Sequence, residues 1–234
     1  MEGPYRPLTE ETKLRRLLIS AAYRLAYPLL WLVIVPFYRL KVTGRHRIRN
    51  IGGAVTVMNH CLYLEWFFVC RAAWPRQPRF SMEEANIRRK DVGWANRLMG
   101  GFGIPDDHPM AVAPKVRELL KKGELVHFFP EGYLRFRSQS PSGFLPGAAW
   151  FACMNNVPII PMAEVLLSRG IHRAAPWWPP RVRLVIGLPL YPADYQASGT
   201  RLRDRAARMT EDCERFIRET IAREGGNYNW PSGG

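Results

Sequence analysis

The stretch that decides the fold reads AVTVMNHCLYLEWFFVCRAA and covers residues 54–73. Its first five residues, Ala54–Met58, are mostly β-branched or apolar, which is typical of a buried β-strand. The apolar run at residues 64–73 predicts a helix. A strand that leads directly into a helix is a building unit of layered α/β domains. This segment therefore predicts an α/β fold.

The same alternation continues toward the C-terminus. We expect further strands at residues 125–129, 158–163 and 182–186, and further helices at residues 91–99, 113–122, 148–155 and 202–223. In the last helix, apolar side chains recur every three or four positions, as in a helix that packs on a core. The sequence thus predicts one layered α/β domain over residues 41–224, with a central mixed sheet flanked by helices. Residues 225–234 are expected to form a flexible tail.

Composition limits the class of protein. The chain has 234 residues, of which 47% are hydrophobic and 23% charged, and these globular values exclude a disordered or collagen-like chain. The net charge of +14 indicates an anionic partner, which can be nucleic acid, anionic lipid, an acidic carrier protein or a phosphorylated substrate. The four cysteines show no metal or redox spacing, which favours a reduced, cytosol-facing protein.

The basic charge is concentrated near the N-terminus. Residues 12–64 contain no Asp or Glu but nine Lys and Arg, and an apolar segment at residues 17–38 lies among them. Pro28 interrupts its uncharged part, which is shorter than the roughly 20 residues of a spanning helix. We expect residues 1–40 to form a helical anchor in the membrane interface, either one helix or two halves broken near Pro28. The alternative is a core helix flanked by solvated arginines.

The main chemical signal follows the first strand of this stretch. His60 and Glu65 are five residues apart, so on one continuous helix their side chains would point about 140° away from each other. They can meet only if His60 lies in the turn between strand and helix. The carboxylate would then hold the Nδ1 proton and leave Nε2 as a general base. For an isolated pair, the alternative is a helix-capping histidine beside an unrelated surface glutamate.

A second signal follows the next predicted strand. Phe129–Gly132 reads FPEG, and Arg135 and Arg137 come shortly after it. Open α/β sheets bind ligands at the carboxyl ends of their strands, and arginines there suit a phosphate or another anion. The VPIIP segment at residues 157–161 is apolar and is expected to line the site or pack.

The remaining histidines and tryptophans fit simpler roles. His46, His108, His127 and His172 do not cluster at ligand spacing, so no metal site is expected. His127 lies inside an apolar strand and is interpreted as a core histidine with satisfied hydrogen bonds. The adjacent tryptophans Trp177 and Trp178 are interpreted as a second patch in the membrane interface rather than as a binding cage.

Together these motifs resemble the lysophospholipid acyltransferase family, which includes the bacterial 1-acyl-glycerol-3-phosphate acyltransferases. The family's four blocks occur in order within residues 42–190: Asn59-His60-x4-Glu65, Gly100–Pro105, Phe129–Gly132 and Val157–Pro161.

The resemblance implies transfer of a fatty acyl chain from acyl-CoA or acyl carrier protein to the free hydroxyl of a lysophospholipid, without a cofactor. The first acceptor candidate is 1-acyl-glycerol-3-phosphate, which would give phosphatidic acid. In the family's pattern His60 is the base, Glu65 holds its ring, and Glu131 and Gly132 shape the acceptor pocket. Cys61 stands at a variable position and is interpreted as packing. Residues that would line the acyl chain or support the structure are Asn59, Pro130, Val157, Pro158 and Pro161.

Three positions depart from the family's pattern. Glu65 replaces the usual Asp, Asp106 and Asp107 follow the second block where an arginine is expected, and Tyr133-Leu134 replace Thr-Arg. The reaction type is thus better supported than the acceptor, which can also be a glycolipid, an aminolipid or another lysolipid. Cations that could substitute for the missing arginines are Arg97, Lys115, Arg135 and Arg137.

The alternative from another class is a non-catalytic basic protein that binds membrane or nucleic acid. No zinc-finger, RRM or KH signature is present, so nucleic acid is not expected as a partner. We expect an enzyme at the cytoplasmic face of the inner membrane, in contact with anionic lipid.

Overall fold

The computed structural model describes residues 13–141, 143–169, 179–196 and 201–226. The tryptophans at 177–178 and all but the first two residues of the predicted tail lie outside these ranges.

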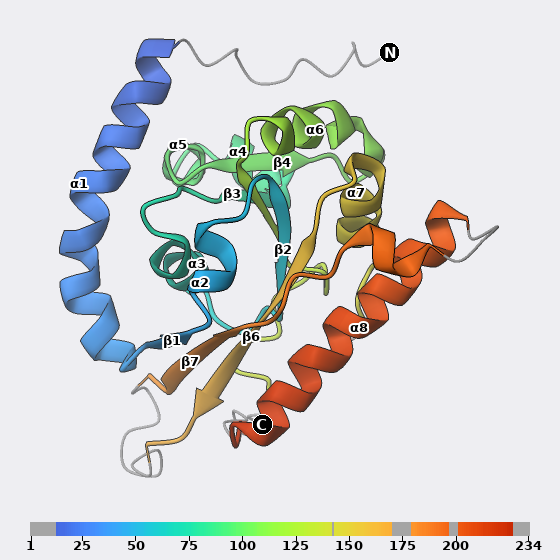
Figure 1. The fold of residues 1–234 in the computed structure, drawn as a ribbon. Helices are drawn as coiled ribbons and strands as arrows, with labels where there is room; N and C mark the ends of the chain where they lie inside the picture. Colours follow the sequence, from blue (N-terminus) through green and yellow to red (C-terminus); the bar gives the residue numbers. More distant parts are fainter. Residues whose placement is uncertain (1–12, 142, 170–178, 197–200, 227–234) are drawn as a thin grey trace.

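A seven-stranded sheet forms the centre of the molecule (Figure 1). Its order is β1-β7-β6-β2-β5-β3-β4, and neighbouring strands are parallel except for the antiparallel pair β6 and β7. The predicted mixed sheet is therefore confirmed. The strands are β1 (Lys41–Thr43), β2 (Ala54–Met58), β3 (Arg79–Glu83), β4 (Gly101–Ile104), β5 (Leu125–Phe128), β6 (Ile159–Leu167) and β7 (Arg181–Ile186).

Helices cover both faces of this sheet. Two large hydrophobic cores result: one lies beneath α1 and α3, and the other beneath α6, α7 and α8. The helices are α1 (Lys13–Tyr38), α2 (His46–Arg49), α3 (Glu65–Ala73), α4 (Glu84–Arg88), α5 (Gly93–Leu98), α6 (Ala113–Lys121), α7 (Gly147–Asn155) and α8 (Leu202–Arg223), with 3-10 turns at Pro109–Val112 and Pro192–Tyr195. The sequence predicted α3, α5, α6, α7 and α8 to within two residues at each end.

Three strands were missed from the sequence, namely β1, β3 and β4. Each has three to five residues, and none has the continuous apolar run that marks β2. In β4 the glycines have a packing reason: a Cβ at Gly101 would lie 2.7 Å from the Asn96 carbonyl oxygen. A side chain would thus prevent the close approach of α5 to the sheet. The predicted strand at residues 158–163 is longer than expected, because β6 continues to Leu167.

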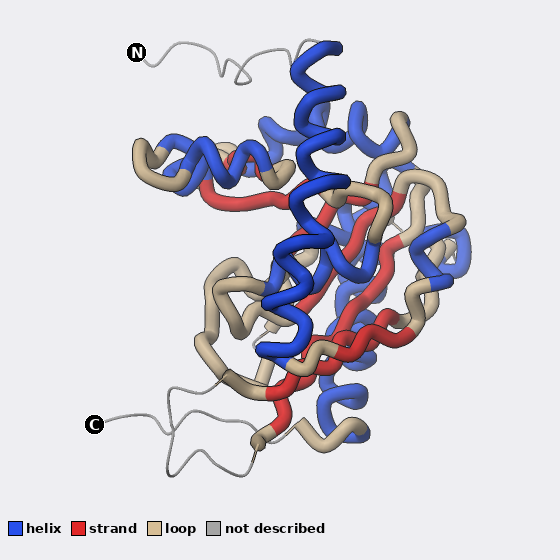
Figure 2. Tube along the Cα trace, turned by 90° about the vertical axis from the view of Figure 1, so that its left-hand side faces the viewer, coloured by secondary structure: helices blue, strands red, loops and turns tan. Residues whose placement is uncertain are grey.

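Helix α1 is continuous through Pro28, so the expected alternative of two half-helices is wrong (Figure 2). The helix lies in front of the strands in that view. Its aromatic side chains Tyr23, Tyr27 and Trp31 follow each other at four-residue spacing and are buried against α3. These contacts hold both sides of the proline in place, even though proline removes one helical hydrogen bond.

The opposite side of α1 is apolar and exposed, with Leu25, Leu29, Leu32 and Val33 each more than two thirds accessible. One side of the helix therefore belongs to the domain core, as in the core-helix alternative, and the other side is available for an external contact. Within the described residues, no helix combines the length and apolarity that a membrane crossing requires.

Candidate active site

The site lies where the parallel strands β2 and β5 end beside the longer strand β6. Strand β2 pairs with β5 on one side and β6 on the other, with Val57 opposite Phe128 and opposite Pro161. The loops that follow β2 and β5 therefore start side by side, and the second half of β6 passes next to them. This edge is where a parallel sheet offers a ligand site.

His60 and Glu65 meet in the loop after β2. The Nδ1 atom of His60 lies 2.5 Å from Oε2 of Glu65, which is a short hydrogen bond. Glu65 is the first residue of α3, so the sequence-based condition that His60 lie in the turn before the helix is fulfilled. The imidazole is 25% exposed and the carboxylate 1%. One nitrogen of the ring is thus engaged with Glu65, and Nε2 is the nitrogen that can take a proton.

The Glu65 carboxylate is held by backbone as well as by the imidazole. Its Oε1 accepts hydrogen bonds from the backbone N–H groups of Cys61 and Leu62. Burial raises the pKa of Glu65, while these donors favour its ionised form and oppose the rise. The same carboxylate therefore caps the turn before α3 and orients His60.

The FPEG turn after β5 fixes the backbone of His60 from the other side. Oε1 of Glu131 accepts a hydrogen bond of 2.8 Å from the backbone N–H of His60. Gly132 has φ +77°, a conformation that glycine adopts without a steric penalty, and its N–H donates to the Phe129 carbonyl oxygen. The Glu131 side chain thus positions the dyad residue itself, a role that the sequence did not suggest. A role of Glu131 and Gly132 in acceptor binding stays a prediction.

The surroundings favour the neutral form of His60. Its ring stacks on Phe129 with ring centroids 4.1 Å apart. Burial lowers the pKa of His60, and the nearby Glu164 and Glu131 oppose this decrease. An imidazole that is neutral, partly exposed and oriented through Nδ1 can act as a general base on a hydroxyl group.

The comparisons agree with this geometry. The sequence profile of the Acyltransferase family matches residues 39–165, which is more than half of the chain. This chain belongs to the acyltransferase family. It is 25% identical over 181 residues to the 1-acyl-sn-glycerol-3-phosphate acyltransferase of Bacillus subtilis (strain 168), covering 77% of this chain and 87% of that protein.

Two further proteins are similar to this acyltransferase. A chloroplastic 1-acyl-sn-glycerol-3-phosphate acyltransferase of Arabidopsis thaliana is 28% identical over 133 residues, covering 55% of this chain but only 36% of that protein. The crystal structure of the 1-acyl-sn-glycerophosphate (LPA) acyltransferase PlsC from Thermotoga maritima superposes with a TM-score of 0.62 at 17% identity, covering 93% of this chain and 82% of that chain. At this identity the structural likeness shows a shared fold.

The four candidate cations of the acyltransferase are placed differently. The backbone N–H of Arg135 donates to the His60 carbonyl oxygen at 2.8 Å, and that of Arg137 donates to the Cys61 carbonyl oxygen at 2.7 Å. The structure therefore joins their segment directly to the dyad loop. Arg97, by contrast, donates to the Ile87 carbonyl oxygen, and Lys115 pairs with Glu118 in its own helix. These contacts do not connect either residue with the dyad.

Arg137 stands out among them. It is buried, its guanidinium lies 5.1 Å from the ring centroid of Phe136, and its φ of 55° is in the left-handed region. Such a conformation is costly for a residue with a side chain, and it concentrates at functional sites. Arg135 directs its guanidinium to the Ser140 carbonyl oxygen at 2.7 Å.

The remaining motif residues take part in hydrogen bonds that hold the structure together. The Asn59 side chain pairs with the backbone of Glu164 in both directions, accepting from its N–H at 2.9 Å and donating to its carbonyl oxygen at 3.0 Å. The carbonyl oxygen of Pro130 accepts a hydrogen bond from Leu145, that of Pro158 from Val55 and that of Pro161 from Gly187, while Val157 donates to the Ala152 carbonyl oxygen. These bonds tie the VPIIP segment to the sheet and to α7, in line with the packing alternative.

Cys61 is fully buried and free, and burial raises the pKa of its thiol well above the ordinary value. A thiol that stays protonated is a poor nucleophile, so the interpretation of Cys61 as a packing residue holds. All four cysteines of the chain are free and buried.

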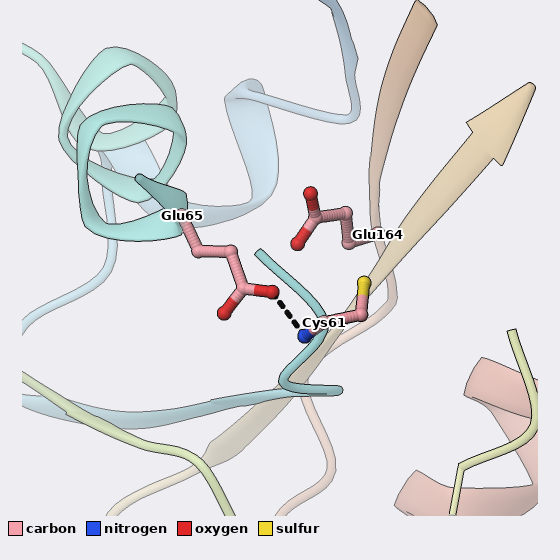
Figure 3. A group of neighbouring side chains, drawn as sticks. All are labelled: Cys61, Glu65 and Glu164. Atoms are coloured by element: carbon pink, nitrogen blue, oxygen red, sulfur yellow. Dashed lines mark hydrogen bonds between the residues drawn. The ribbon is translucent and has the colours of Figure 1, made fainter. Parts of the chain in front are cut away.

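Two features of the site were missed or misjudged from the sequence. His127 is buried with Nδ1 at 2.9 Å from the Thr56 hydroxyl, but its Nε2 has no partner, so the expected full satisfaction is wrong. Glu164 was not singled out, although a glutamate within a strand of nine buried residues was a usable signal. The carboxyl group of Glu164 forms a buried cluster with the Cys61 sulfur and with the carboxyl group of Glu65, the acidic member of the dyad (Figure 3).

Proposed function

We propose that this acyltransferase moves a fatty acyl chain from an acyl thioester to the free hydroxyl of 1-acyl-glycerol-3-phosphate, giving phosphatidic acid for phospholipid synthesis. The observation that carries the proposal is the 2.5 Å contact between His60 and Glu65 at the carboxyl edge of the sheet. The names of the bacterial and plant relatives support the choice of acceptor.

The reaction follows from this contact. Nε2 of His60 takes the proton of the acceptor hydroxyl while its oxygen attacks the thioester carbonyl carbon. Collapse of the tetrahedral intermediate breaks the carbon–sulfur bond, and the imidazolium returns the proton to the thiolate of the leaving carrier. Glu65 stabilises the imidazolium between these two steps. No side chain is acylated, and the products are the diacyl lipid and the free thiol of CoA or acyl carrier protein.

Arg135 and Arg137 are the proposed ligands of the acceptor phosphate. Their segment is bonded to the dyad loop, and a guanidinium binds a phosphate through charge-assisted hydrogen bonds. Asp106 and Asp107 are exposed after β4, where the family's pattern has an arginine. This departure is the specific reason to keep a second acceptor class, namely a neutral or zwitterionic lysolipid or a glycolipid.

A competition assay separates the two acceptor classes. Purified enzyme receives 1-acyl-glycerol-3-phosphate, a monoacylglycerol and lysophosphatidylcholine at equal concentration, once with acyl-CoA and once with acyl carrier protein as donor. We expect the phosphatidate product to dominate. A dominant neutral or zwitterionic product would overturn the acceptor assignment, while no product from any acceptor would overturn the proposed activity.

Arginine variants test where the phosphate of the acceptor binds. Arg135→Gln and Arg137→Gln are each expected to raise the KM for 1-acyl-glycerol-3-phosphate about tenfold, the effect of one lost hydrogen bond to a charged group. Arg117→Gln is the matched control because Arg117 is an exposed arginine on α6. An unchanged KM in both site variants would show that the phosphate binds elsewhere.

We also propose that the exposed aliphatic side of α1 contacts an anionic membrane surface at the cytoplasmic face of the inner membrane. Leu25, Leu29, Leu32 and Val33 supply the apolar contact, and the net charge of +14 favours anionic headgroups. The double variant Leu29→Glu/Leu32→Glu should lose sedimentation with phosphatidylglycerol vesicles. Leu188→Glu, which changes an exposed leucine elsewhere in the chain, should retain it. Equal binding by both variants would exclude α1 as the contact.

A further inference from the structure

Glu164 is a carboxyl group in an apolar position. Side chains alternate along β6, and Ile160, Met162 and Leu166, which share its face of the strand, all belong to the core beneath α1 and α3. Glu164 itself is fully buried, and neither of its carboxyl oxygens has a hydrogen-bond partner. A buried ionised carboxylate without a donor is strongly unfavourable. A glutamate on this apolar face of β6 must therefore be neutral or be balanced by another group.

The side chain of Glu164 is directed at the catalytic dyad. Figure 3 shows the carboxyl groups of Glu164 and Glu65 turned toward one another from β6 and α3, with the Cys61 sulfur beside them. Their ligating atoms all lie within 4.8 Å of one another. Two other titratable groups interact with Glu164 through charge, namely His60 and Tyr38 at the end of α1; Arg137 acts on Tyr38 in turn.

The hydrogen-bond capacity of Glu65 leaves room for one more donor. A carboxylate offers about four lone-pair positions. Three of them on Glu65 are used by the N–H groups of Cys61 and Leu62 and by the imidazole of His60. The group that faces the remaining position is Glu164, which can donate only when it is protonated.

We propose that Glu164 is a neutral carboxylic acid whose O–H group donates to the Glu65 carboxylate, so that it acts as a positioning residue for the His60–Glu65 dyad. The two glutamates then carry one proton and one negative charge between them. The charge stays on Glu65, which has three other donors, and the proton stays on Glu164, which has none.

Burial acts in the same direction. It raises the pKa of Glu164 well above the ordinary value, and the neighbouring Glu65 raises it further. When Glu164 loses its proton at alkaline pH, it becomes a second carboxylate beside Glu65 and an acceptor where the dyad needs a donor. The acyl-transfer rate should therefore decline at alkaline pH through an ionisation that belongs to Glu164.

A bound cation is the competing way to balance two buried carboxylates. Zinc would need deprotonated Cys61 and metal–oxygen distances of about 2.0–2.2 Å. Burial keeps the Cys61 thiol protonated, and the oxygens of Glu65 are already engaged with three donors. The observations therefore favour a proton over a metal, and metal content becomes an outcome of the test.

The test compares Glu164→Gln with Glu164→Met. Both variants leave intact the backbone hydrogen bonds of residue 164 with Asn59, and only glutamine keeps an N–H donor for Glu65. We expect Glu164→Gln to keep kcat within about threefold and to lack the alkaline decline. Glu164→Met should lose kcat about tenfold with an unchanged KM, because one hydrogen bond to a charged group is missing. Equal kcat values and equal pH profiles in the two variants would overturn the proposal.

A second readout needs no substrate and so does not depend on the proposed acceptor. In protein labelled with carbon-13 at glutamate Cδ, the NMR signal that disappears in Glu164→Gln should have the shift of a protonated carboxyl group at pH 7. An ionised shift would overturn the proposal, as would stoichiometric zinc in the wild-type enzyme that is absent from Glu164→Gln. If the NMR result holds and no lysophosphatidate is acylated, the proposed acceptor fails and the proton assignment stands.

Discussion

His60 and His127 lie at the ends of neighbouring strands and contact the same ring, Phe129, from different sides. His60 stacks on it at 4.1 Å, and His127 meets it edge-on at 4.8 Å. Their partners differ: His60 is partly exposed and paired with the Glu65 carboxylate, whereas His127 is fully buried and paired with the Thr56 hydroxyl. Burial lowers the pKa of His127 to about 3.

The comparison shows that a histidine near the carboxyl end of a strand is not for that reason alone a general base. A base must be reachable by its substrate and must have a partner that stabilises the protonated form. His60 meets both conditions. His127 meets neither, because its hydroxyl partner carries no charge and its ring is closed off from solvent. The following predictions test this difference, beginning with the largest effect.

His60→Ala should reduce kcat/KM about 10³-fold, within the range attributed to a positioned general base. His127→Gln is the matched control and should retain activity within about threefold. The measurement is radiolabelled phosphatidate formation at saturating donor. Normal turnover by His60→Ala, or an equal loss in both variants, would contradict the distinction between the two histidines.

Glu65→Gln should reduce kcat about 10²-fold, because an amide N–H facing Nδ1 enforces the wrong imidazole tautomer. Glu65→Asp restores the charge but shortens the side chain by one methylene, so its loss should be smaller, about tenfold. Steady-state kinetics of the two variants would check this order. If Gln and Asp variants were equally active, the charge at residue 65 would not matter to the reaction.

The rate should depend on pH through the neutral form of His60. The base is neutral above its pKa, and burial lowers that pKa below 6.5. We therefore expect kcat/KM to be constant near pH 7 and to fall about tenfold per pH unit below the pKa of His60. A profile of kcat/KM from pH 4.5 to 8, with His127→Gln as control, tests this. An acidic limb that shifts in the control would assign the ionisation to His127.

His127 should affect stability rather than rate. Its pKa is about 3 in the folded protein and near 6.5 in the unfolded chain, so the unfolded state binds the extra proton between these values. Stability is therefore lost as the pH falls from 6.5 toward 3, by up to about 1.4 kcal/mol per pH unit. In His127→Gln this contribution should disappear from denaturant unfolding curves. An unchanged pH slope would show that His127 is protonated in the folded state.

Much of the architecture could be predicted from the sequence because β2, β5 and β7 and the longer helices have distinct apolar patterns. The meeting of His60 with Glu65 could be predicted as well, because a strand ends just before His60 and a helix begins at Glu65. The short strands β1, β3 and β4 could not, since two of them lie at the sheet edges and β4 is half glycine.

The parts of the site that escaped prediction depend on contacts distant in sequence. Glu131 reaches the backbone of His60 across 71 positions, and Asn59 reaches Glu164 across 105. Motif spacing contains no information on which atom of Glu131 is used. Nor does it show that the side chain of Glu164, three residues beyond the VPIIP segment, turns toward the dyad rather than toward α8.

The arginine-bearing segment is hydrogen-bonded to the dyad loop by two peptide groups, the N–H groups of residues 135 and 137. These two hydrogen bonds do not use the arginine side chains themselves. Residue 135, whose φ is not constrained to the left-handed region, can be exchanged without detaching the segment from the base. In the proposed reaction, the chain thereby separates two properties that many active sites couple: the residues that move the proton are fixed, while the side chain at residue 135, a proposed headgroup contact, can be exchanged. This makes the segment a suitable place to graft a new lipid preference onto an existing catalyst.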